Sequence, residues 1–421
     1  MIEPFLARYL FWLKPIILAF MLKKLALLTL GTYILITLGA LAFPFQMTSK
    51  IKSVHRAPEG ASAGPGYSGL GFAMVLHYIR DDQLHHFLTA IDQIAAKGFT
   101  HLLISTPMTQ VDAHASGISL QPAENYTPKR THLVAILNHA KAKKLTVTLM
   151  PIVWLQSHGK GWRGKIQPKD WAVWWRHYHA GIVYFAKIAQ ETRVDILSIG
   201  SELLSTESQL ERWTQTIALA REHFQGRLTY SANWDNYAQP SFWDQLDMIG
   251  INAYFDMAST YGDSRGQLKK RWDDIQIQLK AFTEKHHKPL LITELGYPAL
   301  PTGLTAPYDY TNAKQAETDR ATQYKGYQAF IDAWSPALSA PAGSQNLVAI
   351  HLYLWQPASS TGNDKPKDHP GYLHYMDIQG TKSLQLIEQF IQNRHPIHSP
   401  HSFPAHSKIL LPSQPASDSS F

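Results

Sequence analysis

The sequence predicts an α/β fold, a closed (β/α)₈ barrel, and three observations support it. Short apolar runs alternate with amphipathic runs between Gly69 and about Arg394, and eight such units fit into about 325 residues. The first unit, GFAMVLHYIRDD, has no glycine-rich phosphate-binding turn. An open, doubly wound sheet is the alternative, and it normally carries such a turn after its first strand.

The apolar runs are the predicted strands. Each is short and mostly apolar, as expected for parallel strands that are buried on both faces. The eight predicted strands are 71–77, 101–106, 146–154, 194–200, 228–233, 248–254, 289–294 and 347–355.

Most of the intervening runs have the periodicity of amphipathic helices, which would cover the outside of the barrel. The predicted helices are 83–97, 128–144, 170–190, 208–224, 267–286 and 314–334, with a last one at 383–392 after the eighth strand.

An N-terminal segment has the properties of a membrane span. Residues 25–45 contain no charge, and 21 apolar residues are enough for a helix to cross a bilayer. One interpretation is an uncleaved anchor that follows a leader or cytoplasmic segment, 1–24. The other is a signal peptide that begins at Met21 and is cleaved at Ala40-Leu41-Ala42. Signal peptides have apolar regions of ~7–15 residues, so the length favours the anchor.

The rest of the chain divides into three parts. Residues 46–68 are predicted to be a linker, 69–394 the barrel, and 395–421 a disordered tail with four His, five Pro and seven Ser. We expect the barrel to be periplasmic or extracellular and held at the membrane by the N-terminal helix. Secretion after signal cleavage is the alternative.

The distribution of charge excludes one class of partner. The formal net charge is +7, but residues 1–56 hold seven basic residues and one acidic residue, which leaves 32 basic and 31 acidic residues in the remainder. A nearly neutral body does not predict nucleic-acid binding. The chain has no cysteine, so disulfides, thiolate catalysis and cysteine-ligated zinc are excluded as well.

Two glutamates directly follow or end apolar runs, Glu202 in DILSIGSE and Glu294 in LLITELGYP. The carboxyl ends of barrel strands are where these folds place their chemistry. Such a pair suits glycoside hydrolysis, in which one carboxyl group protonates the leaving oxygen and the other attacks the anomeric carbon. We expect the charge of Glu294 to keep Glu202 protonated. A structural ion pair is the alternative for either residue alone.

Aromatic residues support a carbohydrate substrate. Eleven of the twelve tryptophans lie between Trp154 and Trp355, and indole rings offer flat apolar faces to sugars. The candidates for substrate binding are those at predicted strand ends: Trp154, Asn233, Trp234, Tyr254 and Trp355. Tyr254 is also expected to donate a hydrogen bond to Glu294 and keep it ionised and oriented.

Four segments carry a resemblance to a known group: SIGSELLSTE (198–207), LTYSANWDNY (228–237), FWDQLDMIGINAYF (242–255) and LLITELGYP (290–298). They resemble the retaining glycosidases of clan A and, within it, glycoside hydrolase family 113, the (β/α)₈ β-mannanases. The resemblance implies that Glu202 is the acid/base and Glu294 the nucleophile, with Asn233, Trp234, Tyr254 and Trp355 beside the cleaved bond. It favours a β-mannan-like poly- or oligosaccharide substrate. No cofactor or metal is expected, and we expect a monomer.

One position departs from the pattern. Many members of the clan have Asn immediately before the acid/base, where it holds the sugar 2-hydroxyl, and this chain has Ser201. We expect either a water molecule or Asn233 to take that task.

Other function classes remain open. A metal-dependent barrel hydrolase would need His-x-His near the first strand, whereas the chain offers only His77 and the adjacent pair His85-His86. A membrane-tethered glycan-binding barrel, a transglycosylating barrel without net hydrolysis and a membrane-tethered scaffold are the further alternatives. The presence of both carboxylates favours the enzyme.

Overall fold

The computed structural model describes residues 68–76, 79–121, 127–156, 161–309, 316–341, 346–357 and 373–394. All of them belong to the second of two units, Ala57–Phe421. In this unit eight parallel strands pair in chain order, and β8 pairs with β1 to close a barrel. The strands are β1 Gly69–Val75, β2 His101–Gln110, β3 Thr146–Leu155, β4 Ile196–Ser201, β5 Arg227–Asn233, β6 Ile249–Asn252, β7 Leu290–Leu295 and β8 Leu347–Tyr353. The predicted (β/α)₈ barrel is therefore confirmed.

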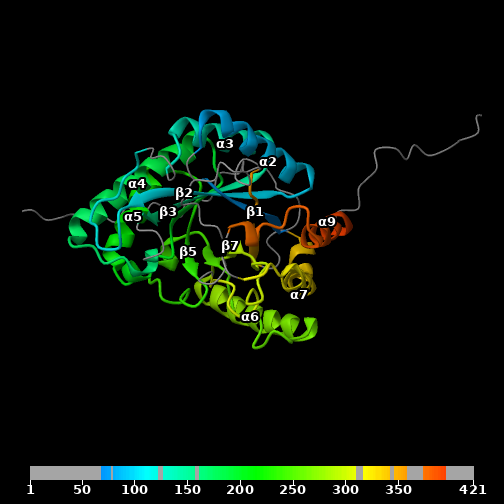
Figure 1. Ribbon diagram of the computed structural model, residues 1–421. Coiled ribbons are helices and arrows are strands. Elements are labelled where there is room, and N and C mark those ends of the chain that lie inside the picture. Colours follow the sequence, from blue (N-terminus) through cyan, green and yellow to red (C-terminus); the bar gives the residue numbers. More distant parts are fainter. Residues whose placement is uncertain are drawn as a thin grey trace, which may run out of the picture. The chain divides into compact units, whose positions relative to one another are not determined.

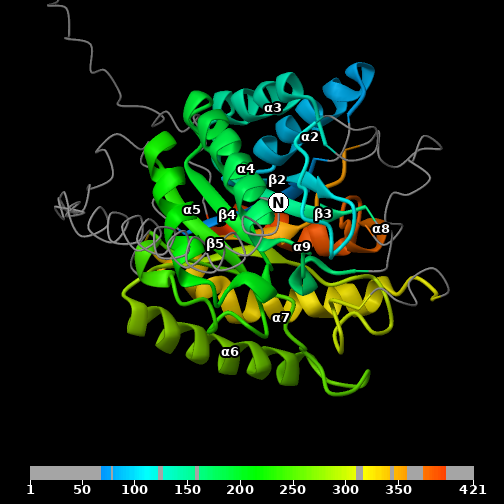
Figure 2. The ribbon, with the colours of Figure 1, turned by 90° about the vertical axis from the view of Figure 1, so that its left-hand side faces the viewer.

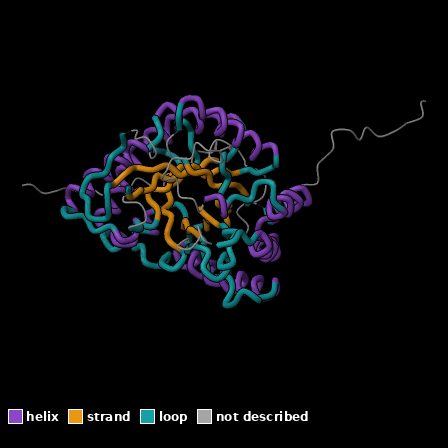
Figure 3. Tube along the Cα trace, in the orientation of Figure 1, coloured by secondary structure: helices purple, strands orange, loops and turns teal. Residues whose placement is uncertain are grey.

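Helices surround the strands on the outside of the barrel (Figures 1 and 3). They are α2 Leu84–Ala96, α3 Arg130–Ala142, α4 Trp171–Glu191, α5 Leu210–His223, α6 Arg265–His286, α7 Arg320–Ser339 and α9 Lys382–Arg394, together with the short α8, Leu373–Met376. Each of the seven predicted helices is present. The connection from β5 to β6 is described throughout and contains one short 3₁₀ helix, Trp243–Gln245, in place of an α-helix.

Polar side chains start several of these helices. Asp170 accepts hydrogen bonds from the second and third backbone N–H groups of α4, and Asp319 accepts one at the start of α7. Ser264 and Gln267 form a reciprocal capping box at α6. These caps satisfy backbone donors that the first helical turn leaves without a partner. Helices α6 and α7 then lie side by side along one flank of the barrel (Figure 2).

An aromatic cluster packs between the outer helices and strands β4 and β5. It consists of Trp174, Trp175 and Tyr178 from α4, Trp213 from α5, Tyr230 from β5, and Phe242. Gly200 in β4 allows this close packing, because a Cβ atom there would lie 2.6 Å from the Tyr178 hydroxyl. The cluster fixes the outer face of the strand end that leads to Glu202.

The predicted membrane segment, 25–45, lies outside the described residues, as do the leader, most of the linker and the tail. Within the ranges described above, no helix is both long enough and apolar enough to cross a membrane. The predicted bounds of these segments stay predictions.

Candidate active site

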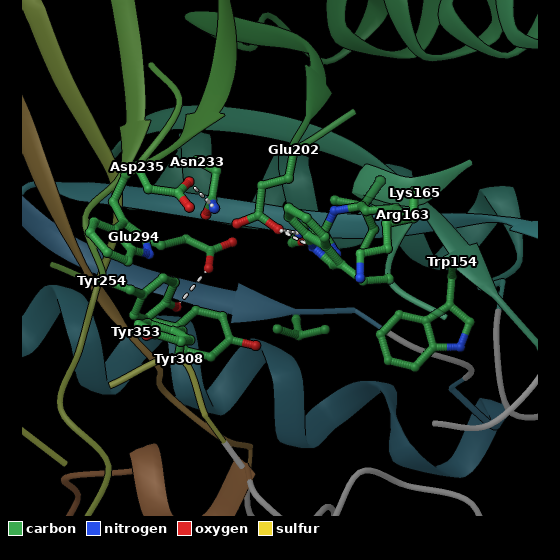
Figure 4. A pocket seen from close by; sticks show the side chains of 15 residues that line it. Trp154, Arg163, Lys165, Glu202, Asn233, Asp235, Tyr254, Glu294, Tyr308 and Tyr353 are labelled. Atoms are coloured by element: carbon green, nitrogen blue, oxygen red, sulfur yellow. Dashed lines mark hydrogen bonds and ion pairs between the residues drawn. The ribbon is translucent and has the colours of Figure 1, made fainter. Parts of the chain in front are cut away.

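A cavity of about 660 Å³ opens at the carboxyl ends of the barrel strands (Figure 4). Its volume falls in the range typical of small-ligand sites, roughly 300–1,000 Å³. Below it, Ile196, Met248, Leu291 and Ala349 pack together inside the barrel and close its floor. The lining residues are Val75, Ser105, Ile152, Trp154, Trp162, Arg163, Lys165, Glu202, Asn233, Trp234, Asp235, Tyr254, Glu294, Tyr308 and Tyr353.

Six of the seven predicted site residues line this cavity: Trp154, Glu202, Asn233, Trp234, Tyr254 and Glu294. Figure 4 shows the carboxyl groups of Glu202 and Glu294 extending into the same hollow. Both glutamates are buried, each with 7% of its surface exposed. The barrel therefore brings together two carboxyl groups that are 92 positions apart in the chain.

Glu202 lies on a tight turn just beyond β4. Its φ of 53° is in the left-handed region, which costs a residue with a side chain about 1 kcal/mol or more. The turn is anchored on β5, because the Glu202 N–H donates to the Ser231 carbonyl at 2.9 Å. Strand pairing between β4 and β5 also shifts register just before this point. The local backbone is thus bent to aim Glu202 into the barrel mouth.

Three donors surround the Glu202 carboxyl group. The Asn252 Nδ2 donates to Oε1 at 2.7 Å, and the Trp162 Nε1 donates to Oε2 at 3.1 Å. The Arg163 Nη2 lies 2.9 Å from Oε2 and forms an ion pair. Arg163 also donates from Nε to the Ser201 carbonyl at 3.0 Å. Arg163 thereby binds both the backbone and the side chain of the turn.

Asn252 is fully buried and has all of its side-chain hydrogen bonds satisfied. Its Oδ1 accepts from the hydroxyl groups of Ser231 at 2.7 Å and Thr293 at 2.9 Å. Its Nδ2 reaches the Ser201 hydroxyl at 3.4 Å as well as Glu202. The two acceptor contacts fix the orientation of the amide, so its donor end faces Glu202.

Glu294 is held differently, within β7, at a point where the pairing with β6 and with β8 shifts register. The Tyr254 hydroxyl donates to its Oε2 at 2.7 Å, which confirms the predicted contact. Burial and then the charge of Glu202 raise the pKa of Glu294 from 4.5 to about 7, although the Tyr254 hydrogen bond and the charge of Arg163 act in the opposite direction. The raised pKa thus belongs to Glu294, whereas the sequence predicts that Glu202 is the protonated group.

Trp355 corrects the sequence prediction. It is 2% exposed and packs edge-on against Phe72, with ring centroids 5.0 Å apart. Strand β8 ends at Tyr353, and the Trp355 N–H then bonds to the Ala73 carbonyl at 2.9 Å. The chain has therefore left the strand direction before it reaches Trp355. Tyr353 forms the cavity wall in its place.

Asn233 also differs in part from its expected role. It lines the cavity, but its Nδ2 donates to the Asp235 Oδ1 at 2.7 Å. The amide next to Ser201 and Glu202 is that of Asn252.

Several site residues were missed by the sequence reasoning. Trp162, Arg163 and Lys165 belong to the long connection after β3, where the short 3₁₀ helix Arg163–Lys165 lies. This segment does not directly follow a predicted strand, so a position at a strand end does not indicate it. Its sequence, GWRGK, does combine basic and aromatic side chains. Tyr308 and Asp235 were missed in the same way, as residues of connections beyond strand ends.

Aromatic rings lie on both sides of the carboxyl pair. Trp234 stacks on Tyr308 with centroids 5.4 Å apart, and Tyr254 meets Tyr353 edge-on at 6.1 Å. In Figure 4 these tyrosines lie on one side of Glu202, and Trp154 lies on the other side with Arg163 and Lys165. Such walls suit a chain of sugar units that extends in both directions from the carboxyl groups.

No group of three or more His, Cys, Asp or Glu side chains is arranged to hold a metal ion among the residues that the structure describes. The site is instead built from carboxylates, amides, hydroxyls, indoles and cations.

Comparison with known families agrees with this geometry. The model of Glycoside Hydrolase Family 113 matches residues 83–338, more than half of the chain. The chain belongs to glycoside hydrolase family 113. It is thus a glycoside hydrolase, as the resemblance of its strand-end motifs predicts. No curated protein matches its sequence.

Solved structures of the family share the barrel. A family 113 β-mannanase from Alicyclobacillus acidocaldarius, in complex with ManMIm, is 20% identical with a TM-score of 0.63, covering 79% of this chain and 99% of that one. A family 113 β-1,4-mannanase, solved as a complex, is 19% identical with a TM-score of 0.62, covering 76% of this chain and 98% of that one. A family 5 protein from Bifidobacterium longum, bound to Manβ1-4GlcNAc, is 14% identical with a TM-score of 0.52, covering 79% of each chain. At these identities the likeness is one of fold.

Proposed function

We propose that this glycoside hydrolase cleaves β-linked poly- or oligosaccharides with retention of configuration, with Glu202 as acid/base and Glu294 as nucleophile. One observation carries the proposal. Two buried glutamates from β4 and β7 face one cavity that is walled by aromatic rings, and one of them is oriented by a tyrosine hydroxyl. Among the residues that the structure describes, no other pair of buried carboxyl groups lines this cavity.

The proposed reaction has two steps. In the first, Glu202 gives its proton to the glycosidic oxygen while a Glu294 oxygen attacks the anomeric carbon, so the bond to the leaving sugar breaks and a glycosyl ester forms. In the second, ionised Glu202 takes a proton from water, the water oxygen attacks the same carbon, and Glu294 leaves as a carboxylate. Two inversions give net retention.

The proton must be redistributed before the first step. Glu294 has a raised pKa of about 7, and Glu202 accepts hydrogen bonds from Asn252 and Trp162 and pairs with Arg163. Catalysis requires the opposite arrangement, with the charge on Glu294 and the proton on Glu202. The charge of Glu202 is one of the causes of the raised pKa of Glu294, so a proton on Glu202 would favour the ionised form of Glu294. We infer that the substrate displaces donors from Glu202 as its glycosidic oxygen arrives.

A β-mannan-like chain is the favoured substrate. Support comes from family membership and from the similar family 113 structures, which are those of β-mannanases. The aromatic walls on both sides of the carboxyl pair are consistent with binding several sugar units.

A product profile tests the substrate. The full chain is incubated with manno-, gluco- and xylo-oligosaccharides of equal length, and products are followed by chromatography and by ¹H NMR of the newly formed anomer. We expect shortened manno-oligosaccharides with the β-anomer formed first. An α-anomer formed first would sink the retaining mechanism. Longer products without net hydrolysis would favour a transglycosylase, and binding without turnover would favour a glycan-binding barrel.

Azide rescue assigns the two roles. The substrate is 2,4-dinitrophenyl β-mannobioside, whose leaving group needs no acid. In Glu202→Ala, azide attacks the glycosyl ester on Glu294 in place of activated water, so we expect a β-glycosyl azide. In Glu294→Ala, azide takes the place of the carboxylate and displaces dinitrophenolate directly, so we expect an α-glycosyl azide. Glu284→Gln, on the exposed side of α6, is the matched control and should give neither product. Azides of the opposite configurations would reverse the assignment.

We also propose that residues 25–45 tether the enzyme to a membrane, with the barrel on the periplasmic or extracellular side. The uncharged stretch and its flanking lysines support this. Carbonate extraction of membranes from expressing cells should leave the full chain in the pellet, and external protease should digest the barrel. Release into the medium with a new N-terminus near Ala42 would favour secretion.

A further inference from the structure

A buried chain of hydrogen bonds lies behind the turn that carries Glu202, outside the cavity. The Leu203 N–H donates to the Tyr230 hydroxyl at 2.7 Å, and this hydroxyl donates to the Glu207 Oε1 at 2.8 Å. Tyr230 has no exposed surface and Glu207 has 2%. Neither residue lines the cavity, so direct contact with substrate is not their function.

This chain acts on a backbone that needs support. Glu202 has a left-handed φ of 53°, and such a conformation persists where the surroundings hold it. Two successive N–H groups anchor the turn to β5, that of Glu202 to the Ser231 carbonyl and that of Leu203 to the Tyr230 hydroxyl. The first anchor is part of the sheet. The second depends on one side chain, which Glu207 in turn keeps oriented.

Resting on the proposed role of Glu202, we propose that Tyr230 and Glu207 are positioning residues for the acid/base, and that they hold its turn in the orientation that allows proton transfer to the leaving oxygen. They act through Leu203 and touch no reacting atom. Removal of this support should slow cleavage of substrates whose leaving oxygen must be protonated by Glu202. It should have little effect on substrates whose leaving group departs without protonation.

The surroundings of Glu207 explain why the contact with Tyr230 matters. The second oxygen of Glu207 accepts from the Asn236 Nδ2 at 3.3 Å. The ionisable groups that act on it are Tyr230, Asp235 and Glu202, and no Lys or Arg forms an ion pair with it within the described ranges. A carboxyl group buried among neutral donors depends on their hydrogen bonds.

The leaving group of the substrate separates positioning from general stability. Mannohexaose needs protonation of its leaving oxygen, whereas the 2,4-dinitrophenol of 2,4-dinitrophenyl β-mannobioside departs without it. For Tyr230→Phe, kcat/KM on mannohexaose should fall about tenfold, the loss expected when one hydrogen bond that positions an acid is removed. On the aryl glycoside it should fall less than about twofold, because the acid is not needed.

Tyr178→Phe is the matched control. Tyr178 is equally buried, packs on the same Trp213 ring, and donates to the Ile199 carbonyl of β4 at 2.6 Å. It does not bond to the turn of Glu202. The Tyr178→Phe variant should therefore lower the thermal midpoint of unfolding about as much as Tyr230→Phe does. It should leave the ratio of kcat/KM on mannohexaose to kcat/KM on the aryl glycoside unchanged. Equal losses on both substrates for Tyr230→Phe, or no loss, would overturn the inference.

The two Glu207 variants test the other end of the chain. Glu207→Gln keeps an acceptor for the Tyr230 hydroxyl. Its ratio of kcat/KM on mannohexaose to kcat/KM on the aryl glycoside should be at least half of the wild-type ratio. Glu207→Leu removes the acceptor and should behave like Tyr230→Phe. A loss of the same size in both variants would contradict a role through this hydrogen bond.

Amide hydrogen exchange at Leu203 gives a readout that needs no substrate. Exchange should become at least about tenfold faster in Tyr230→Phe and stay unchanged in Tyr178→Phe, because only the first loses the acceptor of this N–H. Unchanged exchange would overturn the inference whatever the substrate. If the wild type cleaves neither substrate while exchange responds as expected, the proposed function fails and the support of the turn stands.

Discussion

Glu202 and Glu294 face one cavity but are held there by different means. Glu294 lies within β7, where it pairs with Asn252 of β6, and one hydroxyl contacts its carboxyl group. Glu202 lies beyond the end of β4 on a left-handed turn, and three side chains contact its carboxyl group. One carboxylate is positioned by the sheet and the other by a network of side chains.

The difference has a consequence for mutation. A residue positioned by a strand tolerates changes among its neighbours, because backbone pairing remains. A residue positioned by a network depends on each member, since a buried polar group that loses its partner costs about 1–3 kcal/mol. We therefore expect the surroundings of Glu202 to be the more sensitive half of the site.

The largest effect should come from removal of the carboxyl groups themselves. Glu294→Ala should lower kcat/KM by on the order of 10⁴ on both mannohexaose and the dinitrophenyl glycoside, because no ester can form. Glu202→Ala should lower it by about 10²–10⁴ on mannohexaose alone. Steady-state kinetics on both substrates measures this. An equal loss for both variants on the aryl glycoside would remove the distinction between the two roles.

The next largest effect should come from replacing one hydrogen-bond partner of each glutamate, Asn252 beside Glu202 and Tyr254 beside Glu294. Asn252→Leu leaves Ser201, Ser231 and Glu202 without a shared partner, so kcat/KM should fall about 100-fold and the free energy of unfolding by roughly 2–4 kcal/mol. Tyr254→Phe removes a single hydrogen bond to Glu294. It should lower kcat/KM about tenfold and the free energy of unfolding by less than ~1.5 kcal/mol. Kinetics and urea unfolding measure both. Similar losses in the two variants would mean that the two sides are supported alike.

A smaller effect should appear in the pH profile of Arg163→Gln. The Arg163 charge lowers the pKa of Glu294, so its removal raises that pKa. Glu294 must be ionised to attack, and the acidic limb of kcat/KM should therefore move to higher pH, with a larger loss of activity at pH 6 than at pH 8. Lys165→Gln, a cation of the same connection, should leave the limb in place. A limb that moves to lower pH would contradict the role of Glu294 as the ionised nucleophile.

The strand-positioned half of the site is also the half that the sequence predicts well. Apolar runs locate β4 and β7, and a polar residue at the end of such a run lies at the barrel mouth whatever the loops do. Glu294 and its contact with Tyr254 follow from this rule. The rule also predicts that Glu202 lies at the barrel mouth, but it does not predict the side chains that hold Glu202 there. Asn252 also lies at a strand end, but no local pattern distinguishes an amide that orients a carboxylate from one that merely caps a strand.

The network-positioned half depends on loops and on where strands stop. Arg163 reaches Glu202 from a 3₁₀ helix in the connection after β3, and contacts of this kind carry no sequence period. The prediction that Trp355 binds substrate is wrong for a related reason. Residues two apart share a face in a continuing strand, but β8 ends at Tyr353, so Trp355 turns into the core against Phe72.

The smallest effect concerns stability, and we expect it to be the same for Glu207, behind the turn of Glu202, and for Glu294. Burial raises the pKa of both Glu207 and Glu294 from 4.5 to about 7. Between these values the folded chain binds more protons than the unfolded chain, so the stability that each group contributes is complete below pH 4.5 and is lost as pH rises through 7. Replacing either residue by Gln should reduce the fall in unfolding free energy between pH 5 and pH 6 by about 1 kcal/mol, one proton over one pH unit. Urea titrations at the two pH values measure it, and an unchanged slope in Glu207→Gln would show that this carboxyl group is ionised throughout. The same two variants should differ widely in hydrolysis, because Glu294 lines the cavity and Glu207 does not, and this contrast separates a carboxyl group that reacts from one that positions.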